Sequence, residues 1–342
     1  MIRKIIFLFF FSPFFIFAQI AGNDGFSFIN MEISPRVEAM GGSVIAIYDN
    51  DLSIAQTTPS LLNSMMHNNI VFAYTDYVSD INLIGFSYAR FVKKYGTVSF
   101  SVKAINYGEF DLNDEYGNKT GIFSVNDQVF TFGIGRWIHN RLSIGANINF
   151  LNSQYASYSA IAIASNCAIT YINQKNQIQS TLLFKNIGRQ IDLYAAERES
   201  LPFEIQIGLS KKLTYLPFRY HLTYTKLDQY DIKSPYRLNT QTNLETGDLD
   251  LKEETIAKTL LRHVVIGGEL NPFRKQLFLR GGFNFQRRFD MNLSNHLSFT
   301  GFSFGLGIKL YDFDVDYSRS SYHVSGYPNN FSIVINLSTF GI

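Results

Sequence analysis

The chain has 342 residues, of which 46% are hydrophobic and 17% charged, and its formal net charge is +2. A charge this close to neutral gives no electrostatic basis for binding nucleic acid, and the single cysteine, Cys167, excludes an internal disulfide and a Cys-x-x-Cys metal or redox motif. Aromatic residues make up 15% of the chain, a content that suits the outer face and the interfaces of a membrane barrel.

Residues 1–18 are predicted to be a secretory signal peptide. Arg3 and Lys4 supply the positive start, and the apolar run that follows is too short to be a good spanning helix. Ala18 supplies the small residue at the cut, so the mature chain is expected to begin at Gln19. No cysteine follows the cut, so a lipoprotein anchor is not predicted.

The next segment, residues 19–68, does not alternate cleanly and includes charged residues such as Arg36, Glu38, Asp49 and Asp51. Short helical or turn pieces are expected within it. A segment of this kind cannot span lipid, so it lies either in the periplasm or inside a barrel. We expect it to form an N-terminal plug if the barrel is wide enough to need filling.

Residues 69–342 are predicted to form the outer-membrane β-barrel. In the clearest strand, residues 302–310, five apolar side chains alternate with small or polar ones, because a strand sends successive side chains to opposite faces. Its length matches the roughly 9–11 residues of a tilted strand that crosses a membrane. The predicted strands are residues 70–76, 82–91, 97–107, 127–136, 142–151, 159–172, 178–186, 203–210, 218–227, 262–270, 277–286, 300–310, 311–318 and 331–338.

The connections between these strands are alternately short and mostly long, as expected for tight periplasmic turns and longer outer loops. A secreted β-sandwich also has alternating strands. It does not explain the many strands of nine or more residues or the alternation of the connections. The sequence therefore predicts an all-β fold: a transmembrane antiparallel β-barrel of about 14 strands, with a plug segment, in a bacterial outer membrane.

No catalytic, cofactor-binding or metal-binding residue is predicted. Residues 111–117 look like the start of a calcium loop, but the positions that need Gly and Glu hold Tyr116 and Ile122. The six histidines are scattered, and neither a His-Glu-x-x-His nor a Gly-x-Ser-x-Gly motif occurs. We expect His221 and His263 to lie on the polar faces of strands and to make hydrogen bonds in the lumen.

Four carboxylates, Glu204, Glu269, Asp314 and Asp316, are expected to face the lumen, where Arg280 or Lys309 are their candidate partners. A structural role is favoured for them over a catalytic one.

The longest outer loop, residues 228–261, contains a stretch with helical spacing, in which Ile256 and Leu260 lie four residues apart. This helix either docks a partner or, as is more common for such a helix, caps the barrel mouth or lies beside it.

An ordered series of short motifs covers essentially the whole mature chain. The motifs are SPR (34–36), AMGG (39–42), DIN (80–82), INYGEF (105–110), DEYGN (114–118), KNIG (185–188), LPF (201–203), GLSKK (208–212), GFSFG (301–305), YH (322–323) and NFSI (330–333). No single motif is specific, but the series resembles the PorV/PorQ family of the type IX secretion system of Bacteroidetes. The chain departs from the family at Thr58-Pro59-Ser60-Leu61, where relatives commonly have Asn-Pro-Ala-Leu.

The resemblance implies a fourteen-strand barrel with an N-terminal plug, similar to the long-chain fatty-acid transporters. It also implies a non-enzymatic role in the cargo attachment complex, in which PorV works with the sortase PorU, and this chain would hold PorZ at the outer membrane. The implied partners are outer-membrane lipid and these secretion components, without nucleic acid or a cofactor. The alternative is an outer-membrane transporter for long-chain fatty acids or other hydrophobic compounds. An esterase or protease is disfavoured, because the sequence presents no nucleophile constellation.

Overall fold

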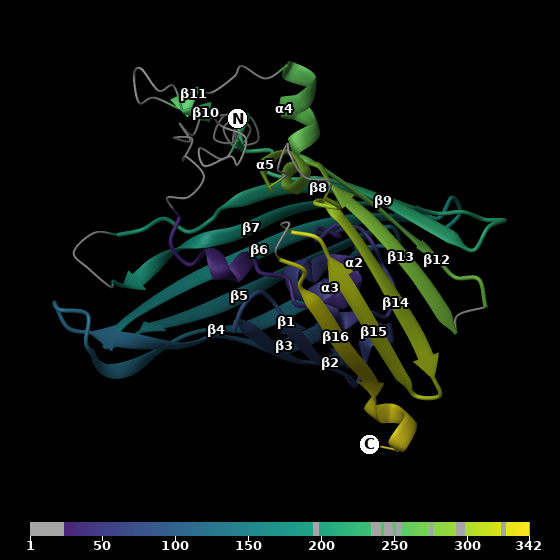
Figure 1. The fold of residues 1–342 in the computed structure, drawn as a ribbon. Helices are drawn as coiled ribbons and strands as arrows, with labels where there is room; N and C mark the ends of the chain where they lie inside the picture. The colour runs from purple at the N-terminus through teal and green to yellow at the C-terminus, as the bar shows by residue number, and fades with distance from the viewer. Residues whose placement is uncertain are drawn as a thin grey trace, which may run out of the picture.

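The computed structural model describes residues 24–193, 198–233, 241–242, 249–250, 255–273, 276–291, 298–322 and 326–341. Within these ranges the strands close into a barrel that holds short helices in its interior (Figure 1). Among the described helices, none is both long and apolar enough to cross a membrane. The signal peptide predicted for residues 1–18 lies outside the described residues and stays a prediction.

The barrel has fourteen strands, and each is paired with its neighbours in antiparallel register. The first strand closes the ring against the last, with Asn69 opposite Asn336. Closure leaves no sheet edge, as a sheet in lipid requires. The predicted fold class is confirmed. The strands are β1 (Asn69–Asp76), β2 (Asn82–Val92), β3 (Gly96–Asn113), β4 (Lys119–His139), β5 (Leu142–Tyr155), β6 (Tyr158–Asn173), β7 (Ile178–Asp192), β8 (Glu204–Lys212), β9 (Phe218–Tyr224), β12 (Val264–Leu270), β13 (Leu277–Asn284), β14 (Phe302–Leu310), β15 (Phe313–Ser320) and β16 (Asn329–Asn336).

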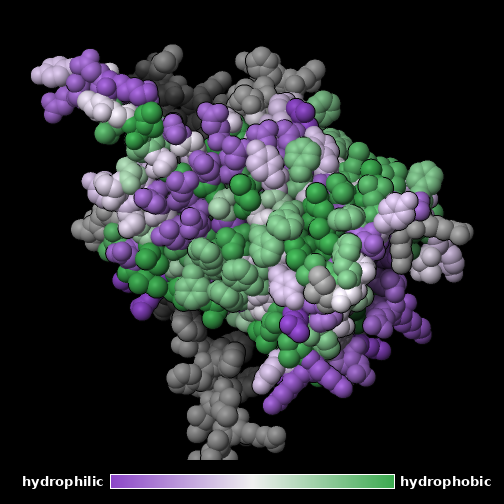
Figure 2. All heavy atoms as spheres, turned by 90° about the horizontal axis from the view of Figure 1, so that it is seen from below, coloured by the Kyte–Doolittle hydropathy of each residue, from purple (hydrophilic) through white to green (hydrophobic). Residues whose placement is uncertain are grey.

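Alternating side chains give the barrel an apolar outer wall. On β14 the predicted register is confirmed: Phe304 is 58% exposed on the outside, whereas Ser303 is 1% exposed and faces the lumen. Broad hydrophobic areas, beside hydrophilic ones, cover the face that Figure 2 shows. The wall therefore fits a membrane environment.

The two ends of the barrel differ in their connections. We call the end with residues 93–95, 140–141, 174–177, 213–217, 271–276 and 311–312 the short-turn end, and the opposite end the long-loop end. The lengths of the connections do not alternate everywhere as predicted. Because β5 and β6 extend further than predicted, they are joined at the long-loop end by only residues 156–157.

The wall is taller on one side. β3 has 18 residues and β4 has 21, whereas β14 has nine. The first of the two corresponding predicted strands ended at residue 107, and the second began at residue 127. The β3–β4 ladder continues past a register shift between Asn106 and Glu109, where Gly108 adopts a φ of 87° that suits glycine. At about 3.3 Å per residue β4 is about 70 Å long, so this side rises well beyond a hydrocarbon band about 25 Å tall.

The long loops carry structure of their own. Helix α4 (Ile256–Arg262) confirms the predicted helix around Ile256 and Leu260, although residues 251–254 lie outside the described part. Helix α5 (Phe285–Met291) begins where the last two residues of the strand predicted for 277–286 were expected, and the rest of it lies where a loop was predicted. Arg262 of α4 pairs with Asp290 of α5. In the same long loop as α4, β10 (Gln241–Thr242) pairs with β11 (Leu249–Asp250).

Residues 24–68, which we call the plug, lie inside the barrel (Figure 1). Ser34 caps helix α2 by accepting a hydrogen bond from Val37, and Pro35 occupies the first helical position. Residues of the plug form two apolar clusters with the inner wall, so the plug is packed against the strands. Its elements are η1 (Ser27–Asn30), α2 (Pro35–Ala39), α3 (Leu52–Thr57), η2 (Pro59–Leu61) and η3 (Ser64–Met66), and a further turn, η4 (Leu337–Phe340), ends the described chain.

Candidate functional site

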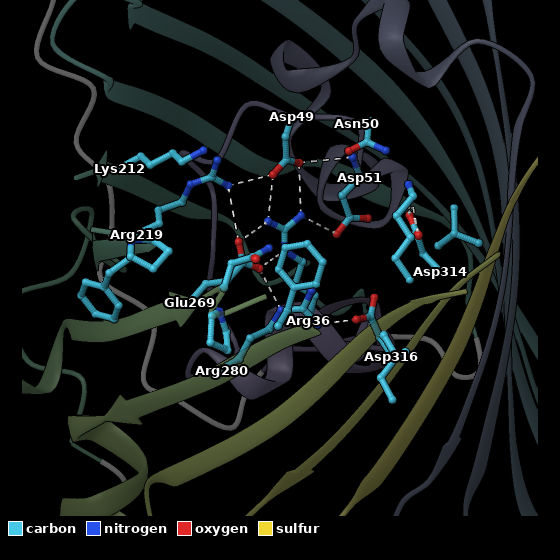
Figure 3. Close-up of a pocket in the computed structure, with 18 of the residues that line it drawn as sticks. Arg36, Asp49, Asn50, Asp51, Lys212, Arg219, Glu269, Arg280, Asp314 and Asp316 are labelled. Carbon is cyan, nitrogen blue, oxygen red and sulfur yellow. Dashed lines mark hydrogen bonds and ion pairs between the residues drawn. The ribbon is translucent and has the colours of Figure 1, made fainter. Parts of the chain in front are cut away.

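A charged cavity of about 850 Å³ lies between the plug and the wall, toward the short-turn end (Figure 3). The plug contributes Arg36, Asp49 and Asp51 to its lining, and β12 and β13 contribute Glu269 and Arg280. These positions face the lumen because they alternate with outward apolar residues. The cavity brings together charges that are far apart in the sequence.

Arg36 is the centre of this cluster. Its Nε and Nη2 donate to the two carboxylate oxygens of Glu269, each at 3.0 Å. The remaining donors reach Asp49 at 2.8 Å and Asp51 at 3.0 Å. The planar guanidinium fork is suited to this bidentate pairing. A single plug side chain is therefore held by both the plug and the wall.

Two arginines of the wall complete the cluster. Arg219 of β9 donates to Asp49 at 2.8 Å, and Arg280 of β13 donates to Glu269 at 2.9 Å. Arg280 also pairs with Asp316 of β15. The expected partnerships of Arg280 with Glu269 and Asp316 are confirmed, as is that of Lys309 with Asp314, at 3.3 Å. The fourth expected carboxylate, Glu204, instead accepts hydrogen bonds from Gln206 and the Lys226 backbone.

The electrostatics keep Asp49 and Arg36 of the plug ionised. Burial raises the pKa of Asp49, but the adjacent Arg36 and Arg219 outweigh that effect and hold the pKa well below its usual value. Burial lowers the pKa of Arg36, and Asp49, Glu269 and Asp51 raise it well above its usual value. A group whose pKa is so far from neutral pH does not serve as a general acid or base at neutral pH. The cluster acts as a fastening and as a polar lining.

A second polar cluster fastens the plug nearer the long-loop end. Glu38 of α2 is buried, and Arg287 of α5 donates to it at 3.2 Å. The Tyr322 hydroxyl donates to Glu38 at 2.8 Å, and the Arg287 guanidinium lies 3.8 Å from the centre of the Tyr322 ring. Burial raises the pKa of Tyr322 well above its usual value, so this hydroxyl stays a donor.

The lumen-facing side of β2 to β6 is apolar over one large area. Leu83, Ile105 and Leu151 are at most 1% exposed and face the lumen on β2, β3 and β5. Phe26 and Phe28 of the plug pack against this area, which we call the apolar inner wall. Its further members are Val129, Ala160, Ala162 and Ala164. An apolar lumen area is unusual in a barrel, whose interior is ordinarily polar.

The other residues singled out from the sequence have structural partners. His221 faces the lumen as predicted, and its Nε2 lies 2.9 Å from the Met40 carbonyl oxygen. The expectation that His263 lies on a strand is wrong, because His263 is the C-cap of α4, where its Nδ1 lies 2.8 Å from the Thr225 carbonyl oxygen. Asp114 accepts hydrogen bonds from Tyr116 and Asn118, which close a hairpin turn. No group of three or more potential metal ligands occurs among the described residues.

Arg219 belongs to the charged cluster but is not among the residues singled out from the sequence. The signal was present: Arg219 alternates with Tyr220 and Leu222, which face outward on β9. The parity of the strand therefore placed Arg219 in the lumen. That Arg36, Asp49 and Asp51 converge on it depends on the path of the plug, which has no comparable periodicity.

Comparisons with known proteins give matches in fold. No family model matches the chain, and no curated protein matches its sequence. CymD, a monoaromatic hydrocarbon channel, aligns with a TM-score of 0.51 and 11% identity, over 89% of this chain and 96% of its own. The Pseudomonas putida toluene transporter TodX aligns with a TM-score of 0.51 and 13% identity, over the same shares.

A Pseudomonas aeruginosa FadL homologue aligns with a TM-score of 0.49 and 9% identity, over 89% of this chain and 98% of its own. At these identities the first two likenesses show the fold alone. The chain shares the fold of CymD and TodX, and its own barrel is closed and antiparallel.

Proposed function

We propose that this protein takes hydrophobic compounds across an outer membrane. The apolar inner wall carries the proposal, because a channel for polar solutes would have a polar lining at these positions. Leu83, Ile105 and Leu151 offer a surface on which each buried CH₂ of a solute gains about 0.8 kcal/mol. The fold shared with a toluene transporter and a monoaromatic hydrocarbon channel supports the same function.

In the described structure the plug covers this surface. Phe26 and Phe28 lie against the apolar inner wall, with ring centroids 5.7 Å apart. A hydrophobic solute that binds the apolar inner wall therefore displaces plug side chains and does not displace water. The charged cavity lies toward the short-turn end, so the solute meets apolar wall on the long-loop side and the ion-paired plug beyond it.

The test is uptake of radiolabelled toluene and oleate by cells that carry the chain as their sole barrel of this type. Leu151→Gln makes the apolar inner wall more polar, and uptake is expected to fall several-fold. Leu183→Gln is the matched control, since Leu183 is an equally buried lumen-facing leucine that packs against Ile45 elsewhere. Heat-modifiable gel mobility verifies folding of both variants. Unchanged uptake after deletion of the whole chain would remove this function.

A second candidate is the anchoring of a PorZ-like partner in type IX secretion. The resemblance of the ordered motifs supports it, and so does the tall side of the wall, because a hairpin that rises beyond the lipid offers a surface to a protein. On this hairpin Phe110 stacks on Phe123 with centroids 5.4 Å apart, and Phe123 contacts Tyr155.

The anchoring candidate has its own test. Asp111 and Ile122 are cross-strand partners, so residues 112–121 can be replaced by an Asn-Gly turn without opening the barrel. The shortened barrel is expected to fold but to lose partner capture and surface cargo. Loop 228–261, the contact region expected from the sequence, is shortened in a parallel strain. A complete deletion with normal secretion and impaired solute uptake would favour transport over anchoring.

A further inference from the structure

A groove of about 460 Å³ lies on the outside of the barrel, over β13, β14 and β15. These three strands are neighbours in the barrel wall (Figure 1). Its sides are aromatic and aliphatic: Phe302 and Phe304 of β14 stack with centroids 6.4 Å apart, and Leu279 and Tyr317 belong to the neighbouring strands. Because outward side chains of a membrane barrel face lipid, the groove is exposed to acyl chains.

Two arginines line the groove, but the side chain of Arg280 is paired with Glu269 and Asp316 in the lumen, so Arg319 supplies the charge on the outer surface. Arg319 directly opposes Phe304 in the β14–β15 register, and its side chain is exposed on the outer face. The outward residues that precede it on β15 are Phe313, Val315 and Tyr317. Arg319 is thus the last of an otherwise uncharged outward row.

No anion of the protein neutralises Arg319 within the described part of the chain. The outward positions of β13 to β16 hold no carboxylate. The guanidinium lies 5.2 Å from the centre of the Tyr327 ring, a contact that orients it and leaves its charge intact. A cation facing lipid is costly at the bilayer centre and tolerable near the interface, where it meets headgroups.

The depth of Arg319 matches the headgroup level. It precedes Ser320, the last residue of β15, and opposes the third residue of β14, so it lies near the long-loop end of both strands. The groove extends from there along Phe304 and Leu306 toward the middle of the wall. A cation at the interface above an apolar groove complements a molecule with an anionic head and an acyl chain.

We propose that this groove is a binding site for a phosphorylated membrane lipid. Arg319 holds the phosphate, for which its planar fork is geometrically suited, and one acyl chain lies along Phe302, Phe304 and Leu306. The site faces the membrane, so it is separate from the lumen and from the transport or anchoring function proposed above.

Native mass spectrometry of the mature chain in detergent tests the site. The probes are phosphatidylglycerol and phosphatidylcholine with identical acyl chains, supplied in equal amounts. The wild type is expected to retain phosphatidylglycerol preferentially. Arg319→Gln should reduce this preference about tenfold, the value of one charge-assisted contact, and Arg319→Lys should keep part of it. Arg189→Gln, which removes an exposed arginine of β7, is the matched control and should keep the preference.

The apolar part is tested separately. Phe304→Ala should weaken retention of both lipids while keeping their ratio, whereas Phe132→Ala, which removes a similarly exposed phenylalanine of β4, should change neither. Equal retention of the two lipids by the wild type, or the same preference in Arg319→Gln as in the wild type, would overturn the proposal. Displacement of the lipid by millimolar inorganic phosphate would instead show a free-anion site and would also overturn it.

Discussion

Arg36 of the plug and Glu269 of β12 form a bidentate ion pair, with two nitrogen–oxygen distances of 3.0 Å. The two residues are separated by 233 positions in the sequence. Both side chains are at most 8% exposed, so water does little to screen the pair. The pair joins the plug to the wall in the lining of the charged cavity.

Arg36→Met is expected to destabilise the folded barrel by about 3–5 kcal/mol, because it leaves Glu269, Asp49 and Asp51 with fewer cations in a buried setting. Urea unfolding in detergent, followed by Trp137 fluorescence, measures the change. Lys119→Met is the control, since it breaks the exposed Lys119–Asp111 pair, worth about 0–1 kcal/mol. Equal stabilities of the two variants would contradict a fastening role for Arg36.

Tyr48 of the plug couples its ionisation to the single tryptophan. Trp137 Nε1 donates to the Tyr48 hydroxyl at 2.8 Å, and the rings meet edge to face at 5.3 Å. Burial raises the pKa of Tyr48 to about 12, although the hydrogen bond from Trp137 lowers it. Because the folded pKa exceeds the unfolded value of about 10, the stabilising contribution is complete below pH 10 and is lost as the pH rises through 12.

The expected result is a change of Trp137 fluorescence with a midpoint near pH 12 in the folded barrel. Tyr48→Phe should abolish it, and Tyr215→Phe, which alters a 97% exposed tyrosine, should not. The urea midpoint of the wild type should fall between pH 10 and 12 more steeply than that of Tyr48→Phe. A fluorescence midpoint near pH 10 would show that Tyr48 is accessible to water.

The wall could be predicted from the sequence because its physical cause is local. Every second residue of a lipid-facing strand must be apolar, and β14 displays this as Phe302 through Leu310. All fourteen predicted strands are present. The ends of β3 and β4 were missed, because above the membrane the alternation is no longer imposed by lipid and continues through polar residues and a bulge.

The charged cluster was predictable only in part. Glu269, Arg280 and Asp316 lie on adjacent or nearby strands, and their inward parity brings them together. Arg36 and Asp49 reach the same place through the folded path of the plug, which depends on tertiary packing instead of a repeating pattern. The alternation of inward and outward residues along the strands thus predicts the part of the site that the wall contributes. The part that the plug contributes is known only from the structure.

Two adjacent glycines of β13 make a matched pair for testing how the plug fits the wall. A Cβ on Gly282 would overlap the backbone of Met40 and Gly41, whereas a Cβ on Gly281 would have its nearest neighbour 4.0 Å away, at the Ser303 carbonyl oxygen. Gly282→Ala is expected to cost about 1–3 kcal/mol through overpacking, and Gly281→Ala close to nothing. Urea unfolding measures both, and a stable Gly282→Ala barrel would mean that α2 can move away from β13.

Three arginine substitutions on β14 separate depth in the membrane from contact with the plug. Leu306 lies in the middle of the strand and faces outward, so Leu306→Arg is expected to cost about 2–4 kcal/mol. Phe304 lies nearer the long-loop end, so Phe304→Arg should cost less, because the penalty falls toward about 0–1 kcal/mol at the interface. Refolding into lipid vesicles, followed by heat-modifiable gel mobility, measures both.

Ser303→Arg tests the inner face of the same strand. The sequence predicts that this change is milder than Phe304→Arg, because a lumen ordinarily accepts charge. The structure reverses that expectation: Ser303 is 1% exposed, and its hydroxyl donates to the Ala39 carbonyl oxygen at 3.1 Å. An arginine has no room there unless α2 leaves the wall, so we expect the largest loss of folded barrel in this variant. Ser303→Arg that folds as readily as Phe304→Arg would show that the plug yields at this contact.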